Sequence, residues 1–294
     1  MTTGHSVPPA PSAHPPLAAL PGWSGQSGPP VLAAPARMLA DTWSSMLRVL
    51  LNYRRSPGLV AASLGVPVVM VVVFGYVFGS AMQVPGGGNY REYLMPGLFA
   101  MVAVNGLMPT MVGAARDVGR GVTDRLRSMS VSRTGLLLGQ TLADLLVSVL
   151  VLALLAAVGL AAGWRIRGGA ADAAAAFGLL LLFRFVMTWV GTLLGLAVGR
   201  EDVAGQLAVA IFPLGMVTNA FVPTGGMPGW LRVVADLNPV SSVVQACRGL
   251  FGNPSAPGAT WPLQHAVPTT LLWCAALLAV CGPLAVRKFG THGR

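Results

Sequence analysis

The stretch that decides the fold is LLVSVLVLALLAAVGLAAG, residues 145–163, in which no position is charged. Charge-free runs also cover residues 56–90, 93–115, 203–231 and 249–286. One membrane-spanning helix needs about 20 mostly apolar residues. Strand-like alternation is absent from these runs, so helices are the spanning form that satisfies the backbone. With a mean hydropathy of +0.68 and 54% hydrophobic residues, the sequence predicts an all-α polytopic membrane protein.

Polar turns between the apolar runs divide residues 56–290, the predicted transmembrane domain, into six spans. Between the last two spans, Pro and Gly break residues 223–262 into short amphipathic pieces. The predicted spans are residues 57–79, 93–115, 135–163, 173–199, 203–222 and 263–286.

The segments outside this domain have a different composition. Residues 1–35 contain nine prolines and no charged residue, which indicates a disordered cytoplasmic tail rather than a signal peptide. Residues 36–55 place polar side chains opposite apolar ones, the pattern of a helix lying flat on the membrane surface. An ordinary soluble amphipathic helix is the alternative. Residues 291–294 are expected to form a short cytoplasmic tail.

Basic residues set the predicted orientation. Counted by alternate segments, 13 Lys and Arg fall on the side of the N-terminus and five on the other, with Arg184 left inside the membrane. This bias predicts that both termini are cytoplasmic. The net charge of +10 is therefore explained by the orientation of the chain in the membrane. Because the sequence shows no aromatic-lined basic groove, this charge does not indicate nucleic-acid binding.

Residues for catalysis or metal binding are not gathered in any motif. A P-loop requires a lysine after glycines, but the one lysine, Lys288, follows no glycine-rich loop. GxSxG and HExxH do not occur, and Cys247, Cys274 and Cys281 form no CxxC pair. The sequence predicts no catalytic, cofactor-binding or metal site in this chain.

Polar side chains inside the spans are candidates for a substrate path. Counted from the predicted outer helix ends, Asp144 lies about 28 Å deep and Arg184 about 16 Å deep. The difference of about 12 Å predicts a poor pair, with Asp144 near the inner interface and Arg184 facing another helix or a path for cargo. A purely structural bond is the alternative for Arg184. Asn105 and Asn219 are the other polar candidates.

Glycines recur every fourth residue in several spans, most clearly at Gly191, Gly195 and Gly199. Small residues at this spacing allow helices to approach closely. The spacing is compatible with packing inside one bundle and with a contact between two copies of the chain.

The polar segment RDVGRGVTDRLRSMSVSR, residues 116–133, is too long for a simple hairpin turn. Its Val122, Leu126 and Met129 follow helical spacing, while the charged residues lie mostly on other faces. This pattern predicts a short amphipathic helix at the cytoplasmic surface, on which a partner docks. A solvated loop is the alternative, but it explains the arginines without the apolar stripe.

This segment resembles the loop between the second and third spans in permease subunits of type-2 ABC exporters, in particular the daunorubicin-resistance permease family of actinobacteria. Asp117 stands where the family more often has glutamate, and Ser130 stands where proline is expected. The matching residues are Asp117, Gly121, Thr123, Leu126, Arg127 and Val131–Arg133. The resemblance continues over residues 36–290 and includes Phe221–Pro223, Met227–Trp230, Asn238–Val240 and Arg248.

The resemblance implies an N-terminal amphipathic elbow helix, six spans, a cytoplasmic coupling helix between spans 2 and 3, and short outer helices between spans 5 and 6. It implies a bacterial inner-membrane permease that acts beside a second permease subunit, identical or a sister chain. Because a bundle poor in internal charge cannot bind a highly charged solute cheaply, the exported compound is expected to be amphipathic and drug-like or lipidic. A separate ATPase subunit would use ATP and Mg²⁺, and this chain would bind no cofactor. Membrane lipid is the remaining expected partner.

Two sets of residues receive roles from the resemblance. The coupling helix would dock on the ATPase through Asp117, Gly121, Thr123, Asp124, Arg125, Leu126, Arg127 and Arg133. The outer gate would contain Pro223, Pro228, Trp230, Asn238, Pro239 and Arg248. The alternative class is an ATPase-independent secondary carrier or an intramembrane enzyme. A carrier would be expected to show paired ionisable residues at the membrane midplane and two related halves.

Overall fold

The computed structural model describes residues 42–44, 46–47, 51, 57–77, 89–120, 133–255 and 260–291. Every regular element in these ranges is a helix, which confirms the predicted all-helical fold there. In chain order the elements are α2 (Pro57–Val72), the π-helix η2 (Val73–Val77), α3 (Tyr90–Val104), α4 (Leu107–Gly119), α6 (Arg133–Ala161), α7 (Ala170–Val198), α8 (Glu201–Met216), the 3₁₀ turn η3 (Thr224–Gly226), α9 (Gly229–Leu237), α10 (Pro239–Phe251), α11 (Trp261–Gln264) and α12 (Ala266–Thr291).

Local sequence explains where several of these helices begin and end. Asn89 caps α3 by accepting a hydrogen bond from a backbone N–H two residues on (3.0 Å), and Asn238 followed by Pro239 starts α10. Gly199 and Gly252 end α7 and α10 with φ angles of 66° and 67°. These are left-handed values that favour glycine, so both ends are set by residue type.

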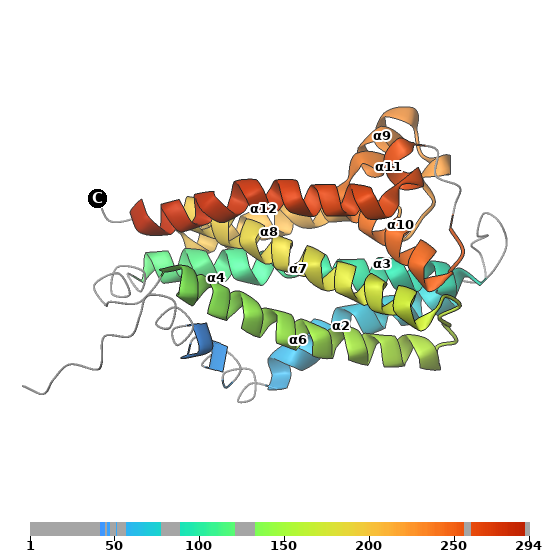
Figure 1. The fold of residues 1–294 in the computed structure, drawn as a ribbon, viewed down its shortest axis with the longest axis horizontal. Coiled ribbons are helices and arrows are strands. Elements are labelled where there is room, and N and C mark those ends of the chain that lie inside the picture. Colours follow the sequence, from blue (N-terminus) through green and yellow to red (C-terminus); the bar gives the residue numbers. More distant parts are fainter. Residues whose placement is uncertain are drawn as a thin grey trace, which may run out of the picture.

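The long helices run side by side along the long axis, and α7 lies at the centre of the bundle, packed against α4, α12, α10 and α3 (Figure 1). The ends of α4 and α7 meet the start of α8 at one end of the bundle. There the Arg116 guanidinium donates to the Glu201 carboxylate (Nε to Oε1, 2.8 Å). The α6–α7 turn and the short helices α9 and α11 lie at the opposite end (Figure 1). One end of the bundle is therefore formed by the ends of α4 and α7 with the start of α8, and the other by the α6–α7 turn with α9 and α11.

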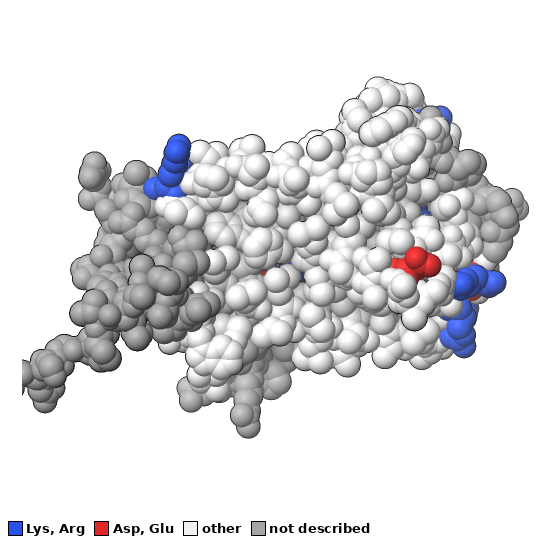
Figure 2. Space-filling view, viewed as in Figure 1, with Lys and Arg blue, Asp and Glu red and all other residues white. Residues whose placement is uncertain are grey.

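Charged side chains gather toward the two ends, leaving a broad belt between them that is nearly free of charge (Figure 2). Within the described ranges, four stretches are long and apolar enough to cross a membrane, and they correspond to the second, third, fourth and sixth predicted spans. These stretches are Tyr90–Gly119, Leu138–Ala161, Ala170–Val198 and Ala266–Lys288. The first predicted span corresponds to α2 and η2, of which Gly65–Val77 forms a shorter apolar stretch. The count of six spans stays a prediction, as does the surface helix over residues 36–55, which falls mostly outside the described residues.

The predicted extent of the fifth span, residues 203–222, was wrong. The helix α8 ends at Met216, because backbone amides beyond it bond to side chains instead of continuing the helical ladder. The Asn219 N–H donates to Ser241 Oγ (3.1 Å), and the Ala220 N–H donates to Thr218 Oγ1 (3.2 Å). The predicted span was too long because its end was placed by apolar composition alone.

The repeated glycines of α7 bring it close to α4. A Cβ at Gly191 or Gly195 would overlap the backbone carbonyl of Leu107 or Met111, respectively. Of the two alternatives for these glycines, the structure shows packing within the bundle. Gly199 instead ends the helix.

Candidate functional site

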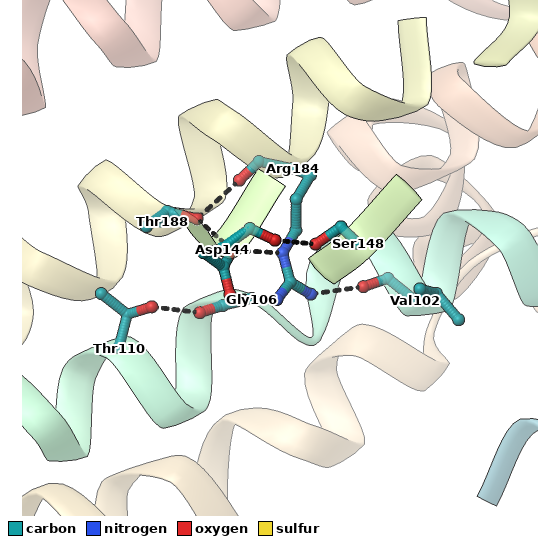
Figure 3. A network of polar contacts seen from close by, with 7 residues as sticks. All are labelled: Val102, Gly106, Thr110, Asp144, Ser148, Arg184 and Thr188. Atoms are coloured by element: carbon teal, nitrogen blue, oxygen red, sulfur yellow. Dashed lines mark hydrogen bonds and ion pairs between the residues drawn. The ribbon is translucent and has the colours of Figure 1, made fainter. Parts of the chain in front are cut away.

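A polar network lies at the middle of α7, where Arg184 reaches toward α3, α4 and α6 (Figure 3). Its guanidinium donates to both oxygens of Asp144 on α6 (Nε to Oδ2, 2.8 Å; Nη2 to Oδ1, 2.7 Å). The Thr188 hydroxyl lies 3.3 Å from the same carboxylate. Both charged side chains are mostly buried, with exposed fractions of 11% and 14%. The pair is therefore bidentate and largely removed from solvent.

The same guanidinium fills a break in the second predicted span. The turn Asn105–Gly106 separates α3 from α4, and the Gly106 N–H bonds weakly to Ala103 rather than to Val102 (3.5 Å). The Val102 carbonyl, left without its helical donor, accepts from Arg184 Nη1 (2.8 Å). A Cβ at Gly106 would lie 2.5 Å from Arg184 Nε. Glycine at this position therefore makes room for the arginine.

The predicted mismatch between Asp144 and Arg184 was wrong. Because α6 ends at Ala161 and α7 begins at Ala170, Asp144 lies 17 residues and Arg184 14 residues from the end that the two helices share. The remaining difference of three residues is about 4–5 Å at 1.5 Å per residue. An arginine side chain spans that distance easily, so the ion pair forms.

A second buried arginine, Arg248 of α10, lies in the half of the bundle that carries α9 and α11. It is fully buried, and its guanidinium donates to the carbonyls of Tyr93 (3.1 Å), Asn219 (2.8 Å) and Ala220 (3.0 Å). It also lies 3.6 Å from the centre of the Tyr93 ring. Among the described residues no carboxylate bonds to it. The turn after α8 is thereby tied to α3 and α10.

Neighbouring contacts hold the same turn. The Tyr93 hydroxyl donates to the Asn219 carbonyl (3.1 Å), and the Tyr90 hydroxyl donates to the Phe221 carbonyl (2.9 Å). Asn238, which caps α10, donates to the Val217 carbonyl (3.1 Å). Tyrosines from α3 and polar groups of α10 therefore fix this backbone from two sides.

The structure brings together only part of the predicted outer gate. Asn238, Pro239 and Arg248 belong to the start and the body of α10, beside Asn219. Pro223 and Pro228 precede the short elements η3 and α9. Trp230 lies on α9 with 72% of its surface exposed. In the part of the chain that the structure describes, the polar partners of Arg248 are Tyr93, Asn219 and Ala220, and none of these last three residues is among them.

The predicted docking residues are described only at their edges. Asp117 lies near the end of α4, and Arg133 begins α6. Gly121, Thr123, Asp124, Arg125, Leu126 and Arg127 lie outside the described residues. Their role in docking stays a prediction.

A small half-open hollow lies between α2, α3 and the end of α8. It is lined mainly by aliphatic and methionine side chains, with Asn105 as its one polar lining residue. Asn105 belongs to the helix break that Arg184 fills. Its lining residues are Val66, Pro67, Met70, Leu98, Met101, Asn105, Met216 and Phe221.

Sequence reasoning missed Gly106, Val102 and Tyr93 as members of these sites. The dipeptide Asn105–Gly106 inside an apolar run is a turn signal that would have indicated the break. Nothing in the sequence points to Val102 or Tyr93 as acceptors, because each contributes a backbone carbonyl.

A helical bundle with an apolar belt, charged ends and a buried internal ion pair defines a multi-pass integral membrane protein. A model of the ABC-2 type transporter family matches residues 40–251, so the chain belongs to that family. The match covers most of the chain, including both buried arginines.

Named relatives align over most of their own length. A daunorubicin resistance ABC transporter permease protein of Streptomyces coeruleorubidus is 28% identical over 257 residues, covering 87% of this chain and 88% of that protein. A probable doxorubicin resistance ABC transporter permease protein of Mycobacterium tuberculosis is 24% identical over 261 residues (86% and 91%). A putative transport permease of Pyropia yezoensis is 24% identical over 224 residues (74% and 75%). The resemblance to type-2 ABC permeases is confirmed.

Proposed function

We propose that the chain is the membrane-spanning subunit of an ATP-driven exporter that moves an amphipathic drug-like or lipidic compound out of the cell. The observation that carries this proposal is the family match over residues 40–251. Alignment with a daunorubicin resistance permease over 87% of the chain supports the direction and the substrate class.

The interior favours a substrate with a large apolar part. The hollow between α2, α3 and α8 offers Asn105 as its single polar lining residue. The charge at the centre of α7 is already neutralised by Asp144. A highly charged solute would lose its hydration without gaining a partner there.

A separate ATPase subunit would supply the energy by binding ATP and Mg²⁺ and docking on residues 116–133. The described edges support this role, because α4 and α6 lead to both ends of the segment. The ion pair between Arg116 and Glu201 ties the same end of α4 to α8. A push on the segment would therefore reach α4, α7 and α8 together, and two partner states would bias two arrangements of the bundle.

The remaining assembly is proposed from the family. Two permease chains, identical or sister, would meet around the pathway in the inner membrane. Each would have six spans and cytoplasmic termini. Residues 36–55 would form the elbow helix.

One observation favours the secondary carrier as a second candidate, because the ion pair between Asp144 and Arg184 lies at the middle of α7. Carriers place such pairs near the membrane midplane. Here the pair also supplies the donor for the Val102 carbonyl at the helix break. The ion pair therefore has a structural role in the bundle, and the family match favours the exporter over the carrier.

The test is affinity capture of the tagged chain from mild-detergent membranes, followed by identification of what co-purifies. We expect an ATPase with a P-loop in the wild-type sample and its loss in Leu126→Asp combined with Arg127→Glu. The matched control is Ile166→Asp combined with Arg165→Glu, the same changes at the opposite end of the bundle, which should retain the ATPase. Absence of an ATPase from every sample would favour the carrier or enzyme.

A further inference from the structure

Three arginines belong to segments at the end of the bundle that carries the α6–α7 turn. Arg91 belongs to the first turn of α3, and Arg165 and Arg167 belong to the turn between α6 and α7. Blue surface gathers at this end of the molecule, at the edge of the uncharged belt (Figure 2).

Arg91 bridges two elements of the bundle. Its guanidinium donates to the carbonyls of Gly75 in η2 (Nε, 3.1 Å) and Ala162 after α6 (Nη1, 3.1 Å). The same group lies 4.0 Å from the centre of the Tyr76 ring. These contacts hold the guanidinium in place at the surface between η2 and the end of α6.

Arg165 is exposed, but its backbone is held firmly. Its Nη1 donates to the carbonyls of Leu160 (2.7 Å) and Trp164 (2.8 Å). Its own carbonyl accepts from Asn253 Nδ2 (2.9 Å), and the Trp164 indole donates to the same side chain (2.8 Å). The backbone that carries this guanidinium is therefore held in place by hydrogen bonds, which lowers the entropic cost of binding a ligand.

Carboxylates at this end leave two of the three arginines unpaired. Glu92, 5% exposed, accepts two hydrogen bonds from Arg167 and raises the pKa of that guanidinium. Asp172 caps the start of α7. Among the described residues, Arg91 and Arg165 contact only carbonyls and a ring, and residues 78–88 contain no charged residue at all.

Capping of the α6 C-terminus explains only part of this arrangement. Each arginine gives one or two Nη1 bonds to the carbonyls there, as C-terminal capping requires. Nη2 of both side chains and Nε of Arg165 have no acceptor among the described residues. These free N–H groups can hold a phosphate in a bidentate manner.

Apolar side chains are exposed directly beside the two arginines. Tyr76 and Val77 of η2 are more than half exposed, and Leu160 and Ile166 are also exposed. Acyl chains can lie against this surface while a headgroup meets the guanidinium groups. A free anion would make no contact with this exposed apolar surface.

We propose that Arg91 and Arg165 bind the phosphate of an anionic phospholipid whose acyl chains lie along Tyr76, Val77 and Leu160. Charge complementarity and continuity with the uncharged belt support a lipid as the occupant. The site is independent of the transported compound and of the ATPase, so it can be tested without transport.

The experiment is native mass spectrometry of the detergent-purified full chain, titrated with phosphatidylglycerol or phosphatidylcholine of the same acyl chains. We expect the wild type to bind phosphatidylglycerol about five to ten times more tightly, and Arg165→Gln to lose most of that preference. Arg165→Lys, which keeps the charge without the bidentate fork, should lose only part of it.

Two control variants separate this site from general charge effects. Arg200→Gln removes another exposed arginine, at the opposite end, and should keep the preference. Glu92→Gln combined with Arg167→Gln removes a neighbouring ion pair without changing the net charge, and should also keep it. Equal loss in Arg200→Gln and Arg165→Gln would refute a defined site.

Other occupants have their own signatures in the same spectra. Displacement of the lipid by inorganic phosphate at similar concentration would show a free-anion site and overturn the proposal. A change in the ratio of monomer to dimer caused by Arg165→Gln would show that a second copy covers this surface, with the same consequence. Equal affinity of the wild type for the two lipids would also overturn it.

Discussion

Arg184 is mostly buried and Arg248 fully buried in the bundle, yet the first lies against a carboxylate and the second against three carbonyls and an aromatic ring. Arg184 lies 14 residues from either end of α7, whereas Arg248 lies near the end of α10. A charge at the centre of an apolar bundle requires an opposite charge, while one near a polar end can be stabilised by dipoles.

The two arrangements differ in what the loss of the arginine leaves behind. Removing Arg184 leaves a buried carboxylate, and removing Arg248 leaves neutral acceptors. The first is the larger penalty, because an unpaired buried charge is far more costly than an unpaired carbonyl.

The largest effect is expected for Arg184→Leu. Loss of the partner of Asp144 and of the donor to Val102 should lower the free energy of unfolding by about 3–5 kcal/mol. Unfolding by SDS in mixed micelles and the amount of protein in membranes would both report it. The double variant Arg184→Leu with Asp144→Leu should recover most of the loss. If the single variant is as stable as the wild type, the pair is not structural and a role in a cargo path becomes the better explanation.

A smaller effect is expected for Arg248→Met, which leaves three carbonyls short of a donor but also removes a buried charge. The net loss should be about 2 kcal/mol, measured by the same SDS titration. Arg248→Lys keeps the charge but lacks the planar fork, so it should not restore stability. A loss as large as that of Arg184→Leu would contradict the distinction between the two sites.

Gly106→Ala tests whether the helix break is shaped around Arg184. The added Cβ would lie 2.5 Å from Arg184 Nε, so the guanidinium must shift, at a cost of about 1–3 kcal/mol. Gly113→Ala, in the helix α4 that follows Gly106, is the control, because nothing lies within 4 Å of its Cβ. That control should be stabilised by about 0.5–1 kcal/mol. Identical unfolding curves for the two variants would mean that the break does not depend on the arginine.

The smallest effect is expected for Tyr93→Phe. This variant keeps the ring beside Arg248 but loses the bond from the hydroxyl to the Asn219 carbonyl (3.1 Å). Because Arg248 still donates to that carbonyl, the free energy of unfolding should fall by about 1 kcal/mol or less. Tyr90→Phe is the matched control, because it also removes one bond from a tyrosine hydroxyl to a backbone carbonyl, that of Phe221. A larger loss at Tyr93 would show that the hydroxyl and Arg248 act as one unit.

The helical fold could be predicted from the sequence because charge-free runs are long and their lengths are fixed by the membrane. The register of Asp144 and Arg184 could not, since helix ends placed two or three residues away shift a side chain by about 3–5 Å. The break at Asn105–Gly106 was visible as a turn dipeptide but was read as part of a span. Apolar composition outweighed that local signal.

The contacts of Arg248 could be predicted from the sequence only as a set of residue types. Arg248 was assigned to the outer gate through the family resemblance, but its partners are carbonyls of Tyr93, Asn219 and Ala220. Tyr93 lies 155 residues away in the sequence. Every residue carries a carbonyl, so no pattern of side chains marks these acceptors.

The glycines that bring α7 against α4 also have a mechanical meaning. Where Gly191 and Gly195 lie against the backbone carbonyls of Leu107 and Met111, the two helices cannot slide past each other without a collision. The two helices therefore move as one rigid unit, with a hinge at Gly106, where α3 ends and α4 begins. An arm of 13 residues is about 20 Å long, so a tilt of 10° at the hinge displaces its far end by about 3 Å. The protein can in this way turn a small rotation beside Arg184 into a displacement of residues 116–120, and the reverse.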